Sequence, residues 1–518
     1  MATLATETPL NRLPVTAAVG PSPVSAGWSW FVAAGLAISY LAASLYISSH
    51  RLLWFDEVFT VHMARLPNWS TLIIALGHGV DSLPPPYYLV VGSFGKVFGH
   101  SELAVRLPST LAMVATLLIV FDCARRLTNG LHGLIALALA SGPLAGEGFE
   151  ARSYAIYVMF AAIALWIWIW GEQTGKKSAL LFGTVLCLAV CFHYYAALLL
   201  VPFALFELIS WKPWQRPSTR IMAGAVGVVL PALFFSPLIT SFSRQFSRGF
   251  WSRPSFSQLI NIYSEIFEGG LLFLALIALW MVLVDRKPAT VAVPAMPSGE
   301  VVGWLFLAIP LAGFLAAEVM TNAFAVRYFL AVVPGVAVAC ASCMWRQFRN
   351  LPLLSAGIFL LFASWGVAKE FDIVRHPESV ETPETRQMLG MEDDLNRDGT
   401  HFLVFSDAFH FLEVQYYSKH PEQCALLLPD DFDQQASSQR STPDPYMHQR
   451  VEVLLSKYYP LKIWRTDVLR ANAQRAIVID PTPEVLDTIK RAGLQITKHA
   501  SKPVPVLYFK EASPAPAL

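Results

Sequence analysis

The stretch RLLWFDEVFTVHMARLPNWSTLIIALGHGVDSLPPPYY, residues 51–88, carries most of the chemistry in this chain that a membrane scaffold does not require. It directly follows the first long apolar segment. Two adjacent carboxylates, Asp56 and Glu57, are followed by an isolated Asp81 that precedes three prolines. Carboxylates beside a membrane span are costly unless they have a partner, a metal ion or an aqueous cleft. The stretch therefore indicates a site.

Composition assigns the chain to the polytopic membrane proteins. Of its 518 residues, 55% are hydrophobic and 14% are charged, and the mean hydropathy is +0.48. These values are far too apolar for a soluble protein of this length. A net charge of +1 gives no general attraction for nucleic acid. The six cysteines, most of them in apolar segments, form no disulfide framework.

Apolar runs of spanning length recur through residues 28–370, about eleven in all at the roughly 20 residues that a crossing needs. They lie near 28–48, 103–124, 131–148, 154–171, 178–193, 195–211, 221–241, 267–284, 301–319, 327–345 and 351–368. Residues 1–27 are polar and lack the basic start and the cleavage site of a signal peptide. We expect a disordered cytoplasmic tail before an uncleaved first span.

Basic residues fall in every second connection between these runs, as at Arg125 and Arg126 or at Arg346 and Arg349. Lysine and arginine are enriched in cytoplasmic loops. The first outer loop, 49–102, is therefore expected outside, together with everything after residue 370. Residues 84–99 are apolar but short, so we expect them to lie at the outer interface.

From residue 371 the composition becomes that of a soluble domain. Short strand-like runs alternate with helical patterns, which predicts a small extracytoplasmic α/β domain over 371–518. The predicted strands are 401–405, 425–428, 476–479 and 504–509, and the predicted helices are 382–396, 408–418, 447–457 and 483–492.

By this topology, acids, arginines and aromatic or imidazole groups gather on the outer face. Guanidinium groups bind phosphate bidentately, and a nearby carboxylate can coordinate a divalent metal or take a proton from a hydroxyl. One arginine at a span boundary can simply snorkel, but several mixed with acids indicate a lipid-phosphate site with a base. The candidates are Asp56, Glu57, Asp81, Arg106, Glu150, Arg152, Tyr154, His193, Tyr194, Arg327 and Tyr328.

Plainer explanations stand beside some of these candidates. Asp56 and Glu57 also suit the first turn of an exposed helix, and Asp81 suits the cap of a turn. His193 and Tyr194 fit an aromatic anchor at the membrane interface as well as they fit a substrate contact.

Six motifs, taken in order, resemble the GT-C glycosyltransferases, in particular bacterial membrane enzymes similar to protein O-mannosyltransferases and to the aminoarabinose transferase of lipid A. The motifs are WFDE (54–57), DSLPPPYYL (81–89), FGHSELAVRLPS (98–109, with Gly99 and Arg106), EARSYAIY (150–157), FHYYAALLL (192–200) and VRYFLAVVP (326–334). The resemblance implies a GT-C helical bundle of about eleven spans with an outer α/β domain. It also implies inverting transfer of a sugar from a polyprenyl-phosphate donor, outside a bacterial plasma membrane. The acceptor would be a glycolipid, a polysaccharide or a protein hydroxyl.

Within this family pattern, Asp56 matches the general base and Glu57 is its neighbour in the catalytic motif. Asp81 would assist acceptor or metal binding, so the resemblance leaves open a divalent metal held by Asp56 and Asp81. The family often has His before two prolines, whereas here Leu83 precedes three. This departure puts metal dependence and the nature of the acceptor in doubt.

The resemblance also implies which residues bind the donor. Glu150, Arg152 and Tyr154 match the block that lines the donor site, and Arg327 with Tyr328 matches the block that holds the donor phosphate. Arginines that neutralise charge on a leaving phosphate are chemically suited to this role.

Two other functions fit a polytopic bundle with charged groups. A lipid or sugar transporter would show inverted repeats or charges near the membrane midplane, and the sequence shows neither. An inactive subunit that only binds a lipid-linked sugar would not need a base such as Asp56. The sequence therefore favours the transferase.

Overall fold

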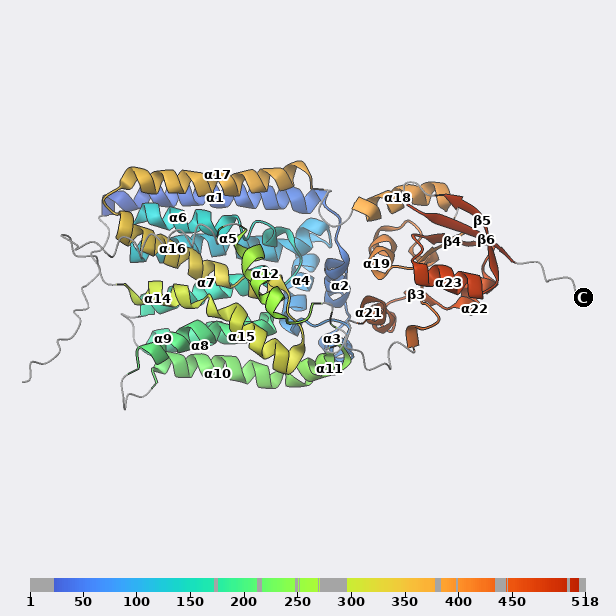
Figure 1. The fold of residues 1–518 in the computed structure, drawn as a ribbon, viewed down its shortest axis with the longest axis horizontal. Coiled ribbons are helices and arrows are strands. Elements are labelled where there is room, and N and C mark those ends of the chain that lie inside the picture. Colours follow the sequence, from blue (N-terminus) through green and yellow to red (C-terminus); the bar gives the residue numbers. More distant parts are fainter. Residues whose placement is uncertain are drawn as a thin grey trace, which may run out of the picture.

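The protein is described by a computed structural model that covers residues 23–171, 176–211, 217–246, 250, 252–268, 270, 296–377, 383–396, 399–433, 444, 446–500 and 504–511. A long helical bundle carries an α/β region at one end (Figure 1). The first and last bundle helices, α1 (Pro23–His50) and α17 (Pro352–Arg375), lie side by side along the bundle. The chain therefore leaves the bundle beside the helix with which it entered.

Helices account for almost all of the described bundle. Between α1 and α17 they are α2 (Phe55–Ala64), α3 (Trp69–Gly77), α4 (Pro85–Phe98), α5 (Glu102–Leu127), α6 (Gly130–Ser141), η1 (Glu147–Phe149), α7 (Tyr154–Gly171), α8 (Lys176–Phe192), η2 (Tyr194–Leu199), α9 (Leu200–Ile209), α10 (Thr219–Phe234), α11 (Ser236–Phe246), α12 (Phe256–Phe267), α14 (Ser298–Leu305), α15 (Ala308–Ala316), η3 (Ala317–Thr321), η4 (Val326–Phe329) and α16 (Val332–Phe348). Several begin at polar caps: the Ser101 hydroxyl accepts from the Ala104 amide before α5, and Asn129 accepts from the His132 amide before α6.

Among the described residues, α1, α5, α7 and α17 are long and apolar enough to cross a membrane. Two bent sets of helices are also long and apolar enough if each set counts as one crossing. They are α10 with α11, bent by 58°, and α14 with α15 and η3, bent by 41°. The protein is therefore a multi-pass membrane protein. A helix or a bent pair of helices lies at each predicted span within the described residues, and the predicted total of about eleven crossings stays a prediction.

Three predicted boundaries need comment. Helix α6 ends at Ser141, short of the predicted 148, because Gly142 and Pro143 follow and proline cannot continue the helical hydrogen bonds. Helix α1 begins at Pro23, inside the predicted polar tail, whereas residues 1–22 lie outside the described part. The predicted span at 267–284 also lies almost wholly outside it. Helix α4 covers the predicted interfacial segment, with 14 residues.

The α/β region is built on a six-stranded sheet in the order β3-β2-β1-β4-β6-β5. Strands β1 to β4 pair in parallel, and β6 pairs antiparallel with both β4 and β5. The elements are α18 (Pro383–Leu395), β1 (Phe402–Phe405), α19 (Ala408–Tyr417), η5 (Pro421–Gln423), β2 (Cys424–Leu427), α21 (Met447–Leu455), β3 (Lys462–Trp464), α22 (Thr466–Ala471), β4 (Ala476–Ile479), α23 (Pro483–Arg491), β5 (Leu494–Ala500) and β6 (Val506–Glu511). The prediction of a small α/β region is confirmed, and β3 and β5 are additional strands.

The core continues from the bundle into the α/β region. One cluster of buried apolar side chains includes Phe55 and Phe59 of α2 together with Phe411 of α19 and Met447 of α21. A second cluster, which includes Val404 and Val478, lies within the α/β region. Burial of continuous apolar surface is the main favourable term in such an association. The α/β region is therefore packed on α2, which carries the WFDE motif.

Candidate active site

Asp56 lies between two arginines that are distant from it in sequence. Its Oδ2 atom is 3.2 Å from Arg327 Nη1 and 3.8 Å from Arg152 Nε. The Asp56 side chain is 21% exposed and that of Arg327 is 26% exposed, whereas Arg152 is buried. A carboxylate and a guanidinium group are therefore both within reach of a substrate.

Aromatic rings hold the Arg327 guanidinium in place. Its Cζ atom lies 5.5 Å from the ring centre of Trp54 and 5.5 Å from that of Tyr154. Cation–π contacts of this kind favour arginine and fix the plane of the guanidinium. Helix α2, the start of α7 and the turn η4 thus meet at this side chain.

Arg152 joins Asp56 to Asp81. Arg152 Nη1 donates to Asp81 Oδ2 at 3.0 Å, to the Asp56 carbonyl at 3.3 Å and to the Thr60 hydroxyl at 3.3 Å. The other oxygen of Asp81 accepts from the amide of Ser82 at 2.6 Å. The DSLPPP segment is thereby fixed against α2 and against the loop before α7.

Glu57 faces away from Asp56, into the core. Arg106 donates to both its oxygens, at 2.7 Å from Nε and at 2.5 Å from Nη2, and the Ala151 amide donates to it at 2.7 Å. Glu57 and Arg106 are both fully buried. Arg106 also donates to the carbonyls of Ser48, Arg51 and Leu52. This pair ties the start of α2 to α5 and to the loop that carries Arg152.

The arginines control the protonation of Asp56. Burial alone would raise the pKa of this carboxyl, but the nearby charges of Arg152 and then Arg327 outweigh burial and hold the pKa below its ordinary value. Asp56 is therefore ionised at neutral pH.

A cavity of about 90 Å³ adjoins these charges. Its wall includes Asp81, His193, Tyr194, Tyr195 and Tyr328. His193 Nδ1 is buried and has no hydrogen-bond partner among the described residues. Aromatic faces with a few polar groups suit a small polar ligand such as a sugar.

The rings around His193 form one cluster. Its imidazole stacks on Tyr157, with ring centres 5.0 Å apart and an interplanar angle of 11°. Tyr154 lies 5.4 Å away and Tyr328 lies 5.7 Å away, measured between ring centres. Tyr154, His193 and Tyr328, three of the predicted substrate residues, therefore lie together.

The structure divides the predicted site residues into two groups. Eight of them surround the cavity and the charged cluster: Asp56, Asp81, Arg152, Tyr154, His193, Tyr194, Arg327 and Tyr328. Glu57 and Arg106 instead form the buried pair behind this cluster, with no exposed surface. Glu150 is half-buried on the loop beside Ala151, within electrostatic range of Arg106 and Tyr87. Roles for all eleven remain proposals.

The residues present do not suit a metal held by the protein alone. The described residues contain no group of three or more His, Cys, Asp or Glu side chains able to hold a metal ion. Asp56 and Asp81 both pair with Arg152, which places a fixed positive charge between the two predicted ligands. We therefore assign no step to a metal.

The α/β region contributes residues to this site that the sequence did not predict. Glu413 accepts from the Phe55 amide at 2.8 Å, and the Tyr417 hydroxyl accepts from the Leu53 amide at 2.8 Å. The ring of His448 lies 5.5 Å from that of Phe55. The sequence AFHFLEVQYY predicts a helix and contains no motif, so no local signal marked these residues.

Comparison with known proteins found a family profile and solved structures of similar fold. Residues 82–240 match the profile of the family described as dolichyl-phosphate-mannose-protein mannosyltransferase. A crystal structure of ArnT from Cupriavidus metallidurans bound to undecaprenyl phosphate superposes with a TM-score of 0.59 at 12% identity, covering 93% of this chain and 98% of ArnT. The chain has the GT-C fold. The apo structure of the same ArnT matches equally well, with a TM-score of 0.59 at 11% identity and the same coverage. Comparison with curated protein sequences gave no match.

The GT-C fold confirms the predicted architecture. The family profile includes Arg106, Arg152 and His193 but begins after Asp81 and ends before Arg327. The likeness to ArnT extends over the α/β region as well, because it covers nearly all of both chains. In this GT-C protein, the charged cluster lies where the bundle meets the α/β region.

Proposed function

We propose that this protein is a glycosyltransferase that moves a sugar from a polyprenyl-phosphate donor to an acceptor hydroxyl, with Asp56 as the general base. The observation that carries the proposal is a partly exposed, ionised carboxylate held against Arg327 beside an aromatic cavity. The shared fold with ArnT, which was crystallised with undecaprenyl phosphate, supports a donor of that class. The acceptor would be a glycolipid, a polysaccharide or a protein.

The chemistry is a single displacement. The acceptor oxygen forms a bond to the anomeric carbon while the bond from that carbon to the phosphate oxygen breaks, so the configuration inverts. The acceptor proton passes to Asp56, and the electron pair leaves with the polyprenyl phosphate. Arg327 stabilises the negative charge that develops on the departing phosphate. Asp56 is a weak base, but a hydroxyl becomes acidic as its oxygen bonds to carbon.

Arg152 would set the position of both acids. It binds the Asp81 carboxylate and the Asp56 carbonyl from a buried position. Asp81 and Tyr194 line the cavity beside it and would contact the substrates. Glu57, Arg106 and Glu150 would act from behind the site by holding α2 and the EARSY loop.

We place this site outside a bacterial plasma membrane. Arg125, Arg126 and Arg346 lie on predicted inner loops, which supports an outer position for the opposite end of the bundle. We retain the division into a membrane domain, 28–370, with an outer loop at 49–102, and an outer domain, 371–518. Donor and acceptor would then meet between the membrane domain and the outer domain.

Arg327→Ala should weaken donor binding. Loss of a hydrogen bond to a charged group costs about 1.5–3 kcal/mol, or roughly 10- to 150-fold in Kd. Binding of undecaprenyl phosphate to purified protein in detergent measures this loss. The affinity of Arg327→Lys for undecaprenyl phosphate should lie between those of the wild type and Arg327→Ala, because lysine keeps the charge but lacks the planar guanidinium. Arg65→Ala is the matched control, because Arg65 is an exposed arginine directly after the helix that carries Asp56. Equal binding by Arg327→Ala and Arg65→Ala would contradict the phosphate role.

The pH dependence of transfer should show no acidic limb from Asp56 near neutrality. Because its pKa lies below the ordinary 3.8, the carboxylate stays available as the pH falls. We expect protonation of Asp56 to lower kcat/KM only below about pH 4. A profile of kcat/KM against pH checks this. An acidic limb near pH 6 that is lost only in Asp56→Glu would contradict this expectation. It would show that the arginines do not hold the pKa of the base low.

A further inference from the structure

We propose that Glu413 of the α/β region is a positioning residue for Asp56: it caps the start of α2 and thereby fixes the direction of the proposed base. The inference rests on the proposed function only for the role of Asp56. The cap itself is a structural claim that can be tested without any activity.

The start of α2 is only partly capped from within: Glu57 Oε2 accepts from the Trp54 amide at 3.2 Å, which leaves the Phe55 amide for another acceptor. The residue before it is Trp54, whose indole can donate a hydrogen bond but cannot accept one. The amide of Phe55 is the first in the helix and has no partner within it. A buried helix start needs an acceptor for such an amide, and the local sequence does not supply one.

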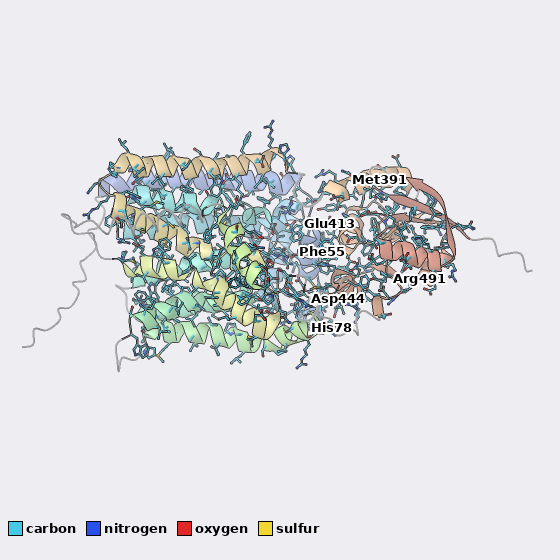
Figure 2. The ribbon with its side chains drawn as sticks, viewed as in Figure 1. Phe55, His78, Met391, Glu413, Asp444 and Arg491 are labelled. Atoms are coloured by element: carbon cyan, nitrogen blue, oxygen red, sulfur yellow. The ribbon has the colours of Figure 1, made fainter. Side chains whose placement is uncertain are left out.

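Glu413 supplies this acceptor from a position 358 residues away in sequence. Its Oε1 atom accepts from the Phe55 amide at 2.8 Å, and its other oxygen accepts from the Thr385 hydroxyl of α18. Glu413 is 4% exposed. Figure 2 shows Phe55 and Glu413 close together where the bundle meets the α/β region. An acidic side chain at this end of a helix is also favoured by the helix dipole.

Asp56 lies between two fixed residues. On one side, Phe55 is held by Glu413, and its ring packs 4.6 Å from that of Phe409. On the other side, Glu57 is fixed by Arg106 in the core of the bundle. The first turn of α2 is thus held from both parts of the molecule, and Asp56 must point toward Arg327.

Small displacements at a catalytic group have large effects on rate. Without the cap, the first turn of α2 would fray and the Asp56 carboxylate would lose its fixed approach to the acceptor hydroxyl. Donor binding through Arg327 would remain, because Arg327 lies on η4, a different segment. The expected signature is a fall in kcat with little change in KM for the donor.

The first test is hydrogen exchange on purified full-length protein. In Glu413→Ala, exchange of amides in residues 53–58 should speed up about five- to tenfold, the effect of losing a typical cap. Glu413→Gln keeps an oxygen that can accept and should stay close to wild type. Tyr416→Phe is the matched control, because it removes a hydrogen bond between the same two helices at Arg65, the other end of α2. Unchanged exchange at 53–58 in Glu413→Ala would overturn the cap.

The second test is sugar transfer by the same variants. We expect Glu413→Ala to lower kcat by about tenfold or more, with the donor KM within about twofold of wild type, and Glu413→Gln to restore most of the rate. Faster exchange with an unchanged kcat would overturn the positioning role, as would equal losses in Glu413→Ala and Tyr416→Phe. A wild-type protein that consumes no donor would refute the proposed function, whereas the exchange result would still decide whether Glu413 caps α2.

Discussion

Asp56→Asn should reduce sugar transfer by at least about a hundredfold, because general-base catalysis contributes 10²- to 10⁴-fold and an amide cannot take the acceptor proton. The side chain keeps its size and lies on a partly exposed surface, so the fold should persist. Donor binding should also persist, because Arg327 and the aromatic cavity are unchanged. Initial rates of donor consumption, measured beside undecaprenyl phosphate binding, separate these effects.

The control for this variant is Asp393→Asn. Asp393 is an exposed acid of the α/β region that pairs with Lys419 at 2.7 Å on the surface. The same chemical change there should leave transfer at the wild-type rate. Turnover by Asp56→Asn at the wild-type rate would show that Asp56 is not the general base, even if the protein proved to be a transferase.

Glu57→Ala should destabilise the protein strongly. The substitution leaves the fully buried Arg106 guanidinium without its carboxylate, and breaking a buried pair in this way costs about 3–5 kcal/mol. We expect a large drop in Tm in detergent and a smaller yield of monodisperse protein. Any loss of activity should follow the loss of folded protein.

The surface pair Lys419–Asp393 provides the comparison for Glu57. Removal of an exposed ion pair changes stability by about 0–1 kcal/mol, so Asp393→Ala should keep nearly the wild-type Tm. A Glu57→Ala protein with wild-type Tm but no transfer would contradict the structural role. That result would instead support a direct catalytic role for Glu57.

The sequence predicted most of the bundle because a span is an apolar run of a length set by the bilayer. The α/β region was predicted less completely, and both missed strands are the edges of the sheet. Strand β3 has three residues, and β5 contains Lys498 and His499. Edge strands in natural sheets are often short or charged, which removes the hydrophobic pattern on which strand prediction depends.

The candidate site was predicted as a set of residues but not as an arrangement. Asp56 and Glu57 are adjacent, yet successive residues of a helix point in different directions, so one faces Arg327 and the other faces Arg106. Which of the two acids faces Arg327 depends on where α5 and η4 pack. Sequence spacing does not contain that information, nor does it reveal that Glu413 would cap α2.

The most direct measurement is turnover of polyprenyl-phosphate sugars by the purified wild-type protein, with membrane extract as the source of acceptor. A panel of donors that differ only in the sugar would be followed for loss of donor, release of polyprenyl phosphate and sugar transferred to the acceptor. We predict that one donor is consumed and that phosphate release matches sugar transfer. A donor that binds and is never consumed would contradict the transferase and indicate a binding subunit. Failure of every donor to bind would instead favour a transporter.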